Sequence, residues 1–232
     1  MDVFFKLYPA THPEISVVIP SKAAIFSQTL NNLSQDLEPS LFEYADQEMM
    51  GHEFPLGNSF DKRTMYNLYF WIMYRLGRDF YELKVMNGTL VTDYDKPVKG
   101  KVYTEEEQKL MKEDNYYIPE WEEKWFQLIL EDNTACISPP EPMYQLTQLI
   151  KVADFLGMDT LIYLLARFIA RKMKENVLYD IDKIDIDNKA QVENFARRWD
   201  AFWYDASYRS QTGKTWLEEW KANRDRSLEQ RK

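Results

Sequence analysis

Two runs of apolar residues near the start of the chain predict a pair of β-strands. Residues 3–8 are mostly apolar or aromatic, and residues 15–19 carry an apolar side chain at every second position. Alternate side chains of a strand lie on one face, so this spacing is typical of a half-buried strand. Because proline and polar residues separate the two runs, we expect a β-hairpin. A third short strand is expected at residues 53–56, where Pro55 indicates an edge or a strand end.

Apolar residues at intervals of three and four predict helices in much of the remaining chain. Ser21 is a suitable N-cap for the first helix, and Gly77 is placed to end the second. Gly157 separates two further helices, the second of which Asp159 can cap. The expected helices cover residues 21–33, 61–77, 142–157 and 159–176, with a last one that opens at residue 188.

Residues 87–117 show neither the alternation that is typical of a strand nor the spacing of three and four that is typical of a helix. They are rich in Lys, Glu, Asp and Gly, and their apolar residues are scattered. We expect mainly a mobile surface loop here, within which residues 104–114 can form a polar helix. The mixture of strand and helix patterns predicts an α+β fold. The expected organisation is a core at residues 1–142, C-terminal helices at residues 143–206 and a polar tail at residues 207–232.

Charge and composition narrow the class of protein. The chain has 232 residues, of which 45% are hydrophobic, and its 38 acidic and 29 basic residues give a net charge of -9. Binding to a nucleic-acid backbone needs clustered Lys and Arg, so we expect no nucleic-acid partner. We also expect no membrane partner, because no apolar run approaches the length of a membrane span. With one cysteine and no secretory signal in view, the expected location is the cytoplasm, the nucleus or both.

Catalytic interpretations find little support in the sequence. The two histidines, His12 and His52, and the lone Cys136 give no metal-ligand spacing. Residues 212–215 read Thr-Gly-Lys-Thr, but a phosphate-binding loop would need a glycine at Tyr208. We therefore expect no enzyme activity, no metal and no cofactor. A cysteine hydrolase that pairs Cys136 with either histidine remains an alternative.

Four segments carry a family resemblance by their order and spacing. They are EISVVIPSKAAIFSQTL at residues 14–30, FPLGNSFDKRTMYNLYFWIMYRL at residues 54–76, IPEWEEKWF at residues 118–126 and ADFLGMDTLIYLLARFIARKM at residues 153–173. Together they resemble the S-phase-kinase-associated (Skp) adaptor family, the linker subunit of SCF-type ubiquitin ligases. The resemblance covers residues 3–203, with residues 87–117 more variable.

The resemblance implies a BTB/POZ fold, which is a small sheet flanked by helices, followed by C-terminal helices that grip an F-box protein. The implied function is that of a non-catalytic adaptor between an F-box partner and a cullin. Asp154 and Phe155 stand where the family faces the cullin. Ile162 and Ile169 stand where the family contacts the F-box, although both also suit the chain's own core. The full set of implied F-box-binding residues is Leu146, Thr147, Ile150, Ile162, Ile169, Phe195 and Trp199.

Two departures from the family pattern support an alternative function. The family's Asn-Tyr pair is replaced by Asp154 and Phe155, and its Thr-Pro-Glu-Glu segment is missing from KENVLYDIDKI at residues 174–184. A misplaced buried charge or hydrogen bond at an interface costs on the order of 2 to 5 kcal/mol. The alternative is a structural or assembly subunit that self-associates as a homodimer or joins a nuclear or chromosomal complex, without ubiquitin-ligase activity.

Two pairs of tryptophans four residues apart each allow two interpretations. Trp121 and Trp125 either cover the chain's own core or form a ridge that binds a partner. Trp216 and Trp220 lie in a polar tail, where they either make a docking or oligomer contact or belong to a disordered segment.

Overall fold

The structure is a computed structural model with an α+β fold. It describes residues 2–44, 46–57, 60–86, 89–131, 144–176, 184, 188 and 190–194. The chain divides into two compact units, which are Met1–Pro119 with Gln148–Leu165 (unit 1) and Glu120–Thr147 with Ala166–Lys232 (unit 2). The expected boundary at residue 142 does not coincide with this division. Residues 148–165, expected among separate C-terminal helices, join the N-terminal sheet in unit 1.

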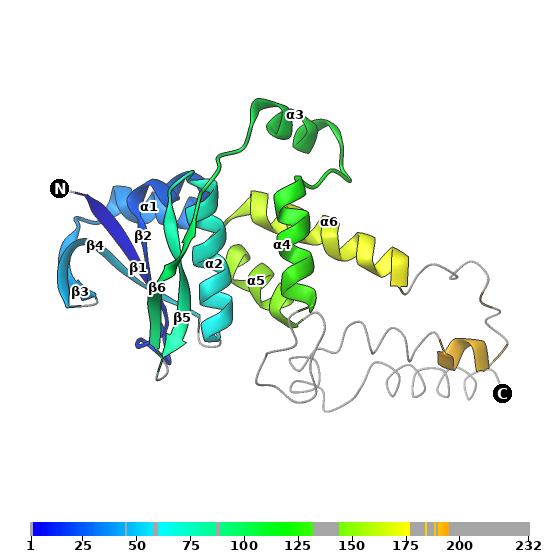
Figure 1. Cartoon of the computed structure of the whole chain (residues 1–232), viewed down its shortest axis with the longest axis horizontal. Coiled ribbons are helices and arrows are strands. Elements are labelled where there is room, and N and C mark those ends of the chain that lie inside the picture. Colours follow the sequence, from blue (N-terminus) through cyan, green and yellow to red (C-terminus); the bar gives the residue numbers. More distant parts are fainter. Residues whose placement is uncertain are drawn as a thin grey trace. The chain divides into compact units, whose positions relative to one another are not determined.

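A four-stranded sheet forms the N-terminal part of unit 1 (Figure 1). The predicted hairpin is confirmed, since β1 (Val3–Pro9) and β2 (Val17–Pro20) pair antiparallel. On the other side β1 pairs in parallel with β4 (Gln47–Leu56), which itself pairs antiparallel with β3 (Ser40–Tyr44). Strand β1 also alternates in burial, because Phe5 and Leu7 are fully buried while Phe4, Lys6 and Tyr8 are only half-buried.

Strand β4 is longer than the sequence pattern predicted, but Pro55 lies where such a residue is tolerated. The partner strand β3 reaches only as far as Gly51 along β4, so the C-terminal half of β4 has a neighbour on one side alone. A proline lacks the N–H that a second neighbour would need. Gly51 is also required, because a Cβ at this position would lie 2.0 Å from the Phe4 carbonyl oxygen.

The first helical segment begins differently from the prediction. Ser21 opens a 3-10 helix, η1 (Ser21–Phe26), and does not cap an α-helix. The chain is extended at Ser27, and the Ser27 hydroxyl accepts a hydrogen bond from the Leu30 N–H at 3.0 Å. The expectation for Ser21 was therefore wrong, because Ser27 is the residue that starts α1 (Gln28–Asp36).

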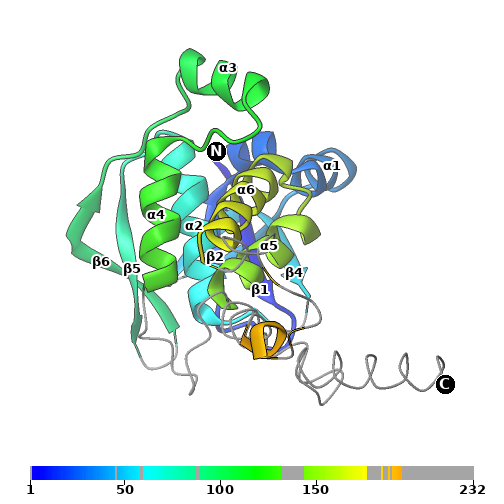
Figure 2. The ribbon, with the colours of Figure 1, turned by 90° about the vertical axis from the view of Figure 1, so that its right-hand side faces the viewer.

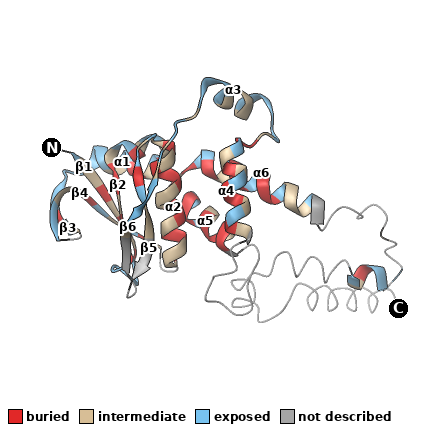
Figure 3. Cartoon of the chain, viewed as in Figure 1, coloured by how far each residue is buried: buried red, intermediate tan, exposed pale blue. Residues whose placement is uncertain are grey.

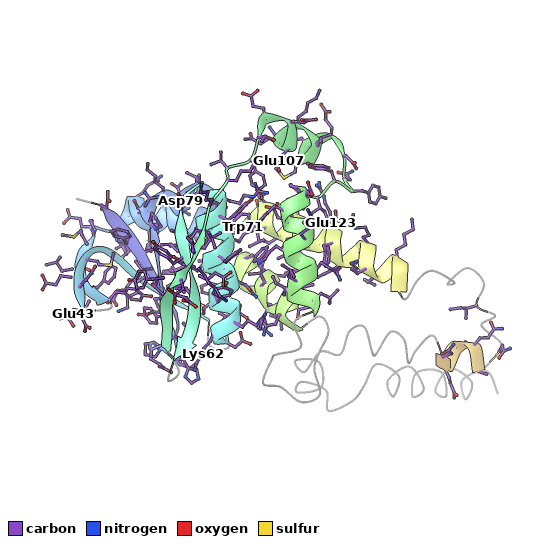
Figure 4. All side chains as sticks on the ribbon, viewed as in Figure 1. Glu43, Lys62, Trp71, Asp79, Glu107 and Glu123 are labelled. Carbon is purple, nitrogen blue, oxygen red and sulfur yellow. The ribbon has the colours of Figure 1, made fainter. Side chains whose placement is uncertain are left out.

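Helix α2 (Lys62–Arg75) confirms the prediction for residues 61–77. Asp61 caps it by accepting a hydrogen bond from the Thr64 N–H at 2.7 Å, and Gly77 follows its end with a φ of 65°. Trp71, labelled in Figure 4, is fully buried on this helix, and Phe26 packs edge-on against it at 5.2 Å between ring centroids. The helix thus carries a large part of the core of unit 1.

The expectation of a mobile loop at residues 87–117 was wrong for most of that segment. It contains β6 (Thr89–Val98), which pairs with β5 (Phe80–Met86), and α3 (Glu105–Glu113), which confirms the polar helix. The hairpin is anchored by Phe80, whose ring packs edge-on against Tyr69 and Phe70 of α2. In Figures 1 and 2, α3 lies beyond an extended segment, and none of its residues is buried.

A buried arginine attaches the segment before α3 to the end of α2. The side chain of Arg75 has no exposed surface, and its guanidinium carbon lies 3.8 Å from the centroid of the Tyr103 ring. Its Nη1 donates to the Lys101 carbonyl at 3.3 Å and lies 3.9 Å from Oε2 of Glu107. Glu107 (Figure 4) also closes a capping box with Thr104 at the start of α3. Because a buried charge needs partners, these contacts fix the segment in place.

The remaining helices are α4 (Glu120–Glu131), α5 (Tyr144–Phe155) and α6 (Asp159–Asn176). They confirm the helices expected at residues 142–157 and 159–176, and Gly157 separates them with a φ of 61°. Both α5 and α6 begin in one unit and end in the other. Residues 190–194 are helical and the Asn188 side chain accepts hydrogen bonds from the N–H groups of Ala190 and Gln191, as expected for a helix that opens there.

Unit 2 has an aromatic core. Phe126 of α4 packs against Phe168 of α6 at 5.4 Å between ring centroids, and both are fully buried. A salt bridge of 3.2 Å between Glu123 and Arg171 joins the same two helices near the surface. Buried positions are drawn in red in Figure 3. The buried apolar residues of this unit among those described are Trp125, Phe126, Ile129, Leu146, Phe168, Ile169 and Val192.

We predict that Arg75→Ala lowers the free energy of unfolding by about 3 kcal/mol, because it removes a buried charge together with its stack on Tyr103, its hydrogen bond to the Lys101 carbonyl and its ion pair with Glu107. Arg75→Lys keeps the charge but loses the planar stack on Tyr103, so it should cost less than the alanine variant. Hydrogen exchange should quicken at the amides of residues 101–113 before it quickens in α1. Equal protection of these amides in wild type and Arg75→Ala would contradict the assigned role.

We predict that the free energy of unfolding falls as the pH rises above 10. Deprotonation of Tyr69 is one of the causes of this loss. Burial raises the pKa of Tyr69 from 10.0 to about 12. The folded protein therefore keeps a proton that the unfolded chain loses between these values, and the stabilisation is fully present only below pH 10. Urea midpoints across this range should decline less steeply in Tyr69→Phe. Tyr81→Phe on β5, where the side chain is 40% exposed, is the matched control and should decline like wild type.

Candidate partner-binding site

The turn between α5 and α6 is bound by the start of α1. The Ser27 hydroxyl donates to the Leu156 carbonyl at 2.5 Å while it accepts from the Leu30 N–H. The N–H of Gln28 donates to the Gly157 carbonyl and that of Thr29 to the Leu156 carbonyl, each at 3.3 Å. We call these contacts between residues 27–29 and 155–157 the α1 clamp. It satisfies unpaired N–H groups of one helix with unpaired carbonyls of another.

Asp154 and Phe155 are presented at the surface of unit 1 by the α1 clamp. The Thr29 hydroxyl donates to the Phe155 carbonyl at 3.3 Å. This hydrogen bond holds the backbone of Phe155, while Phe155 itself remains 45% exposed. The Phe155 ring contacts Phe54 of β4 at 6.1 Å between ring centroids. Asp154 is exposed and forms no ion pair with a residue that the structure describes. An exposed aromatic ring beside an uncompensated carboxylate can bind protein partners.

The predicted F-box-binding residues are divided between the two units. In unit 1, Ile150 and Ile162 are half-buried. In unit 2, Thr147 is half-buried, but Leu146 is fully buried and Ile169 is only 5% exposed. Leu146 and Ile169 are thus covered by the chain itself, which leaves Thr147, Ile150 and Ile162 as the described members with accessible surface.

Two members of the predicted set, Phe195 and Trp199, lie outside the described residues. The tail tryptophans Trp216 and Trp220 lie outside them as well. The predictions for these four residues stay as they were.

Trp125 belongs to the core of unit 2. It is 7% exposed and its ring tilts against Phe126 at 5.3 Å. Trp121 is half-buried and stacks on Trp125 at 5.2 Å with an interplanar angle of 18°. Of the two interpretations of this pair, the contacts support the one in which the tryptophans cover the chain's own core.

The histidines show no catalytic arrangement in the described part of the chain. His52 is 6% exposed and stacks on Phe5 at 5.6 Å, so it packs as a core side chain of the sheet. His12 is exposed, with its Nδ1 at 3.1 Å from Oε1 of Glu14. A backbone hydrogen bond, with a smaller contribution from His12, lowers the pKa of the Glu14 carboxyl. The Cys136 interpretation and the Thr-Gly-Lys-Thr segment fall outside the described residues.

Two searches of the described residues bear on other classes of site. None of their helices is long and apolar enough to cross a membrane. No three or more of their His, Cys, Asp and Glu side chains gather in a way that could hold a metal ion.

Sequence reasoning missed the α1 clamp. The signal for Ser27 was present, because a serine precedes a good helix former, but Ser21 satisfies the same rule. Nothing local indicates Thr29, whose partner carbonyl belongs to Phe155.

Comparisons with known proteins identified no relative of this chain. No family model matches the chain, and neither does any curated protein or solved structure.

We predict that Ile169→Glu unfolds unit 2, while Ile162→Glu leaves unit 1 folded. The first change buries an unpaired carboxylate, which costs several kcal/mol, whereas the half-buried Ile162 lets a carboxylate reach water. Circular dichroism and thermal melts of the two variants on the same helix provide the comparison. An Ile169→Glu protein that melts like wild type would show that this side chain faces outward.

Proposed function

We propose that the chain is a divergent Skp-type adaptor with a BTB/POZ fold. It has no catalytic role, binds an F-box or F-box-like protein, and links that partner to a cullin in ubiquitin conjugation. It acts in the cytoplasm, the nucleus or both. The proposal is supported by a small sheet flanked by helices and followed by the α5–α6 pair, in the order that the family resemblance implies.

The observation that carries this proposal is the exposed pair at the end of α5. The resemblance assigns Asp154 and Phe155 to the cullin-facing surface, and both are exposed there. Covering the rest of the Phe155 ring favours binding by a share of the roughly 1.5–3 kcal/mol that complete burial of such a side chain provides. Asp154 must meet a cation or a hydrogen-bond donor, or its desolvation offsets that gain. A matching cullin surface therefore presents an apolar recess beside Lys or Arg.

Contact with the F-box partner rests on the accessible members of the predicted set. In unit 1, Ile150 and Ile162 retain surface that a helical segment can cover, and Thr147 of unit 2 is a separate accessible position. Leu146 and Ile169 are buried in unit 2 and offer no surface to the partner. An amphipathic partner helix binds through partly exposed apolar anchors of this kind.

An assembly subunit that self-associates is the second candidate, and the edge of the sheet favours it. Strand β3 pairs only with β4 in the described sheet, which leaves its outer backbone groups available for pairing. Leu37 and Leu41 are 56% and 58% exposed at and beside this strand. An edge strand with exposed apolar side chains is a site at which a second copy can add. The acidic Glu43 (Figure 4) opposes such pairing through like-charge repulsion.

We predict that the tagged chain recovers both an F-box protein and a cullin from native extract. Phe155→Ser should reduce recovery of the cullin about tenfold without loss of the F-box protein, because it removes one exposed aromatic anchor. Tyr163→Ser, which changes another exposed aromatic residue, is the matched control and should recover both. Recovery of neither class of protein would exclude the adaptor function. A stable homodimer in light scattering without cullin binding would favour the assembly subunit.

A further inference from the structure

A hollow of about 500 Å³ lies where η1 and the start of α1 meet the start of α6. All of its lining residues belong to unit 1. It is distinct from the Phe155–Phe54 contact, since neither ring lines it. The lining residues on which its chemistry depends are Ile25, Gln28, Asn31, Gly157, Asp159 and Thr160.

The hollow is unsuited to an anion, although two helices begin beside it. The first N–H groups of a helix attract negative charge only when they are free. In α1 the N–H groups of Gln28 and Thr29 donate to carbonyls of the α5–α6 turn, and that of Leu30 donates to Ser27. In the first turn of α6, Asp159 already supplies a negative charge.

The side chains that line the hollow offer several acceptor oxygens, one of them on a carboxylate. Asp159 offers a carboxylate, Gln28 and Asn31 offer amide oxygens, and Thr160 offers a hydroxyl. One lone pair of the Asn31 oxygen is engaged by Gln35 at 3.4 Å, and the other remains. Asp159 forms no ion pair with any residue that the structure describes, and no Lys, Arg or His lines the hollow. The lining therefore suits a cation with several donors.

An apolar side chain stands at the same place. Ile25 lines the hollow and is 74% exposed, the highest exposure of any large aliphatic residue described. The neighbouring Ala23 is buried and Phe26 packs on Trp71, so η1 is firmly held while Ile25 points away from the core. A rigid, exposed isoleucine offers contact area at little entropic cost on binding.

We propose that this hollow binds an arginine side chain of another protein, with an apolar residue of the same segment packed on Ile25. Arginine fits better than lysine because its planar guanidinium carries five donors, which several acceptors on two helices can share. The net charge of -9 favours approach of such a basic segment. This inference is independent of the proposed cullin and F-box contacts, since it uses none of their residues.

The test is a nitrogen-15 NMR titration of the full chain with the peptide acetyl-Leu-Arg-Ala-Leu-Arg-amide at millimolar concentration. Amide shifts should appear at Gln28, Asn31, Gly157 and Thr160, and they should weaken as salt is added. Asp159→Asn should raise the dissociation constant by about threefold or more, the effect of losing one partly exposed ion pair with its hydrogen bonds. Ile25→Ser should also raise the dissociation constant of the peptide, by an effect separate from that of Asp159→Asn.

The controls separate charge at the hollow from charge in general. Asp36→Asn removes the same charge from the far end of α1, eight residues and about 12 Å along the helix from Gln28, and should bind like wild type. A peptide with glutamate in place of arginine should give no shifts at the hollow. Melting temperatures establish that each variant is folded.

The proposal is overturned by equal binding of the arginine and glutamate peptides, by wild-type affinity in folded Asp159→Asn, or by no shift at the highest peptide concentration. Concentration-dependent shifts at the same amides without peptide would assign the hollow to a second copy of the chain, which also overturns it.

Discussion

The exchange of hydrogen bonds between residues 27–29 and 155–157 is the constraint on which the surface of unit 1 depends. A helix leaves N–H groups unpaired at its start, and a helix that ends in a turn leaves carbonyls unpaired. In the α1 clamp each side supplies what the other lacks, and the Ser27 hydroxyl acts as donor and acceptor at once. Leaving a buried polar group unpaired costs about 1–3 kcal/mol, so separating the start of α1 from the α5–α6 turn is energetically unfavourable. They consequently present their side chains in a fixed arrangement.

This constraint also determines the electrostatic character of both candidate surfaces. Because the donors of α1 are consumed within the fold, the surface beside them retains acceptors and carboxylates. Asp154 and Asp159 stand on either side of Gly157, and both are exposed. A partner that approaches either position meets negative charge next to an apolar side chain, Phe155 in one case and Ile25 in the other. Both surfaces therefore favour partner segments in which basic residues are flanked by apolar ones. This preference arises from the backbone hydrogen bonds of the α1 clamp as much as from the side chains at the surface.

Those parts of the fold whose determinants are local could be predicted from the sequence. Helix α2 combines an apolar stripe with its own cap at Asp61 and its own stop at Gly77. Ser21 was mistaken for Ser27 because the deciding partner, the Leu156 carbonyl, is 129 residues away. Strand β3 mixes the polar Ser40 and Glu43 with apolar residues, so its sequence shows no regular period, and its pairing with β4 accounts for its extended conformation.

The candidate site could be predicted only in part, for a related reason. An apolar pattern indicates that Leu146 and Ile169 are covered, but not whether the chain or a partner covers them. The exposed pair at the end of α5 was found because a family pattern drew attention to it. Ile25 looked like an ordinary helix position, and only the structure places Asp159 and Gln28 beside it.

The α1 clamp also imposes an order on the synthesis of the chain. Residues 27–29 are made early, whereas the carbonyls that complete them belong to a turn made more than a hundred residues later. Until that turn emerges, the hairpin of β1 and β2 can form locally, but the start of α1 must be solvated by water. The residues between these two segments, including β5, β6, α3 and α4, are synthesised before the α1 clamp can form. Contacts so distant in sequence form late and slow folding. The turn at residues 155–157 is therefore what allows the first part of the chain to close.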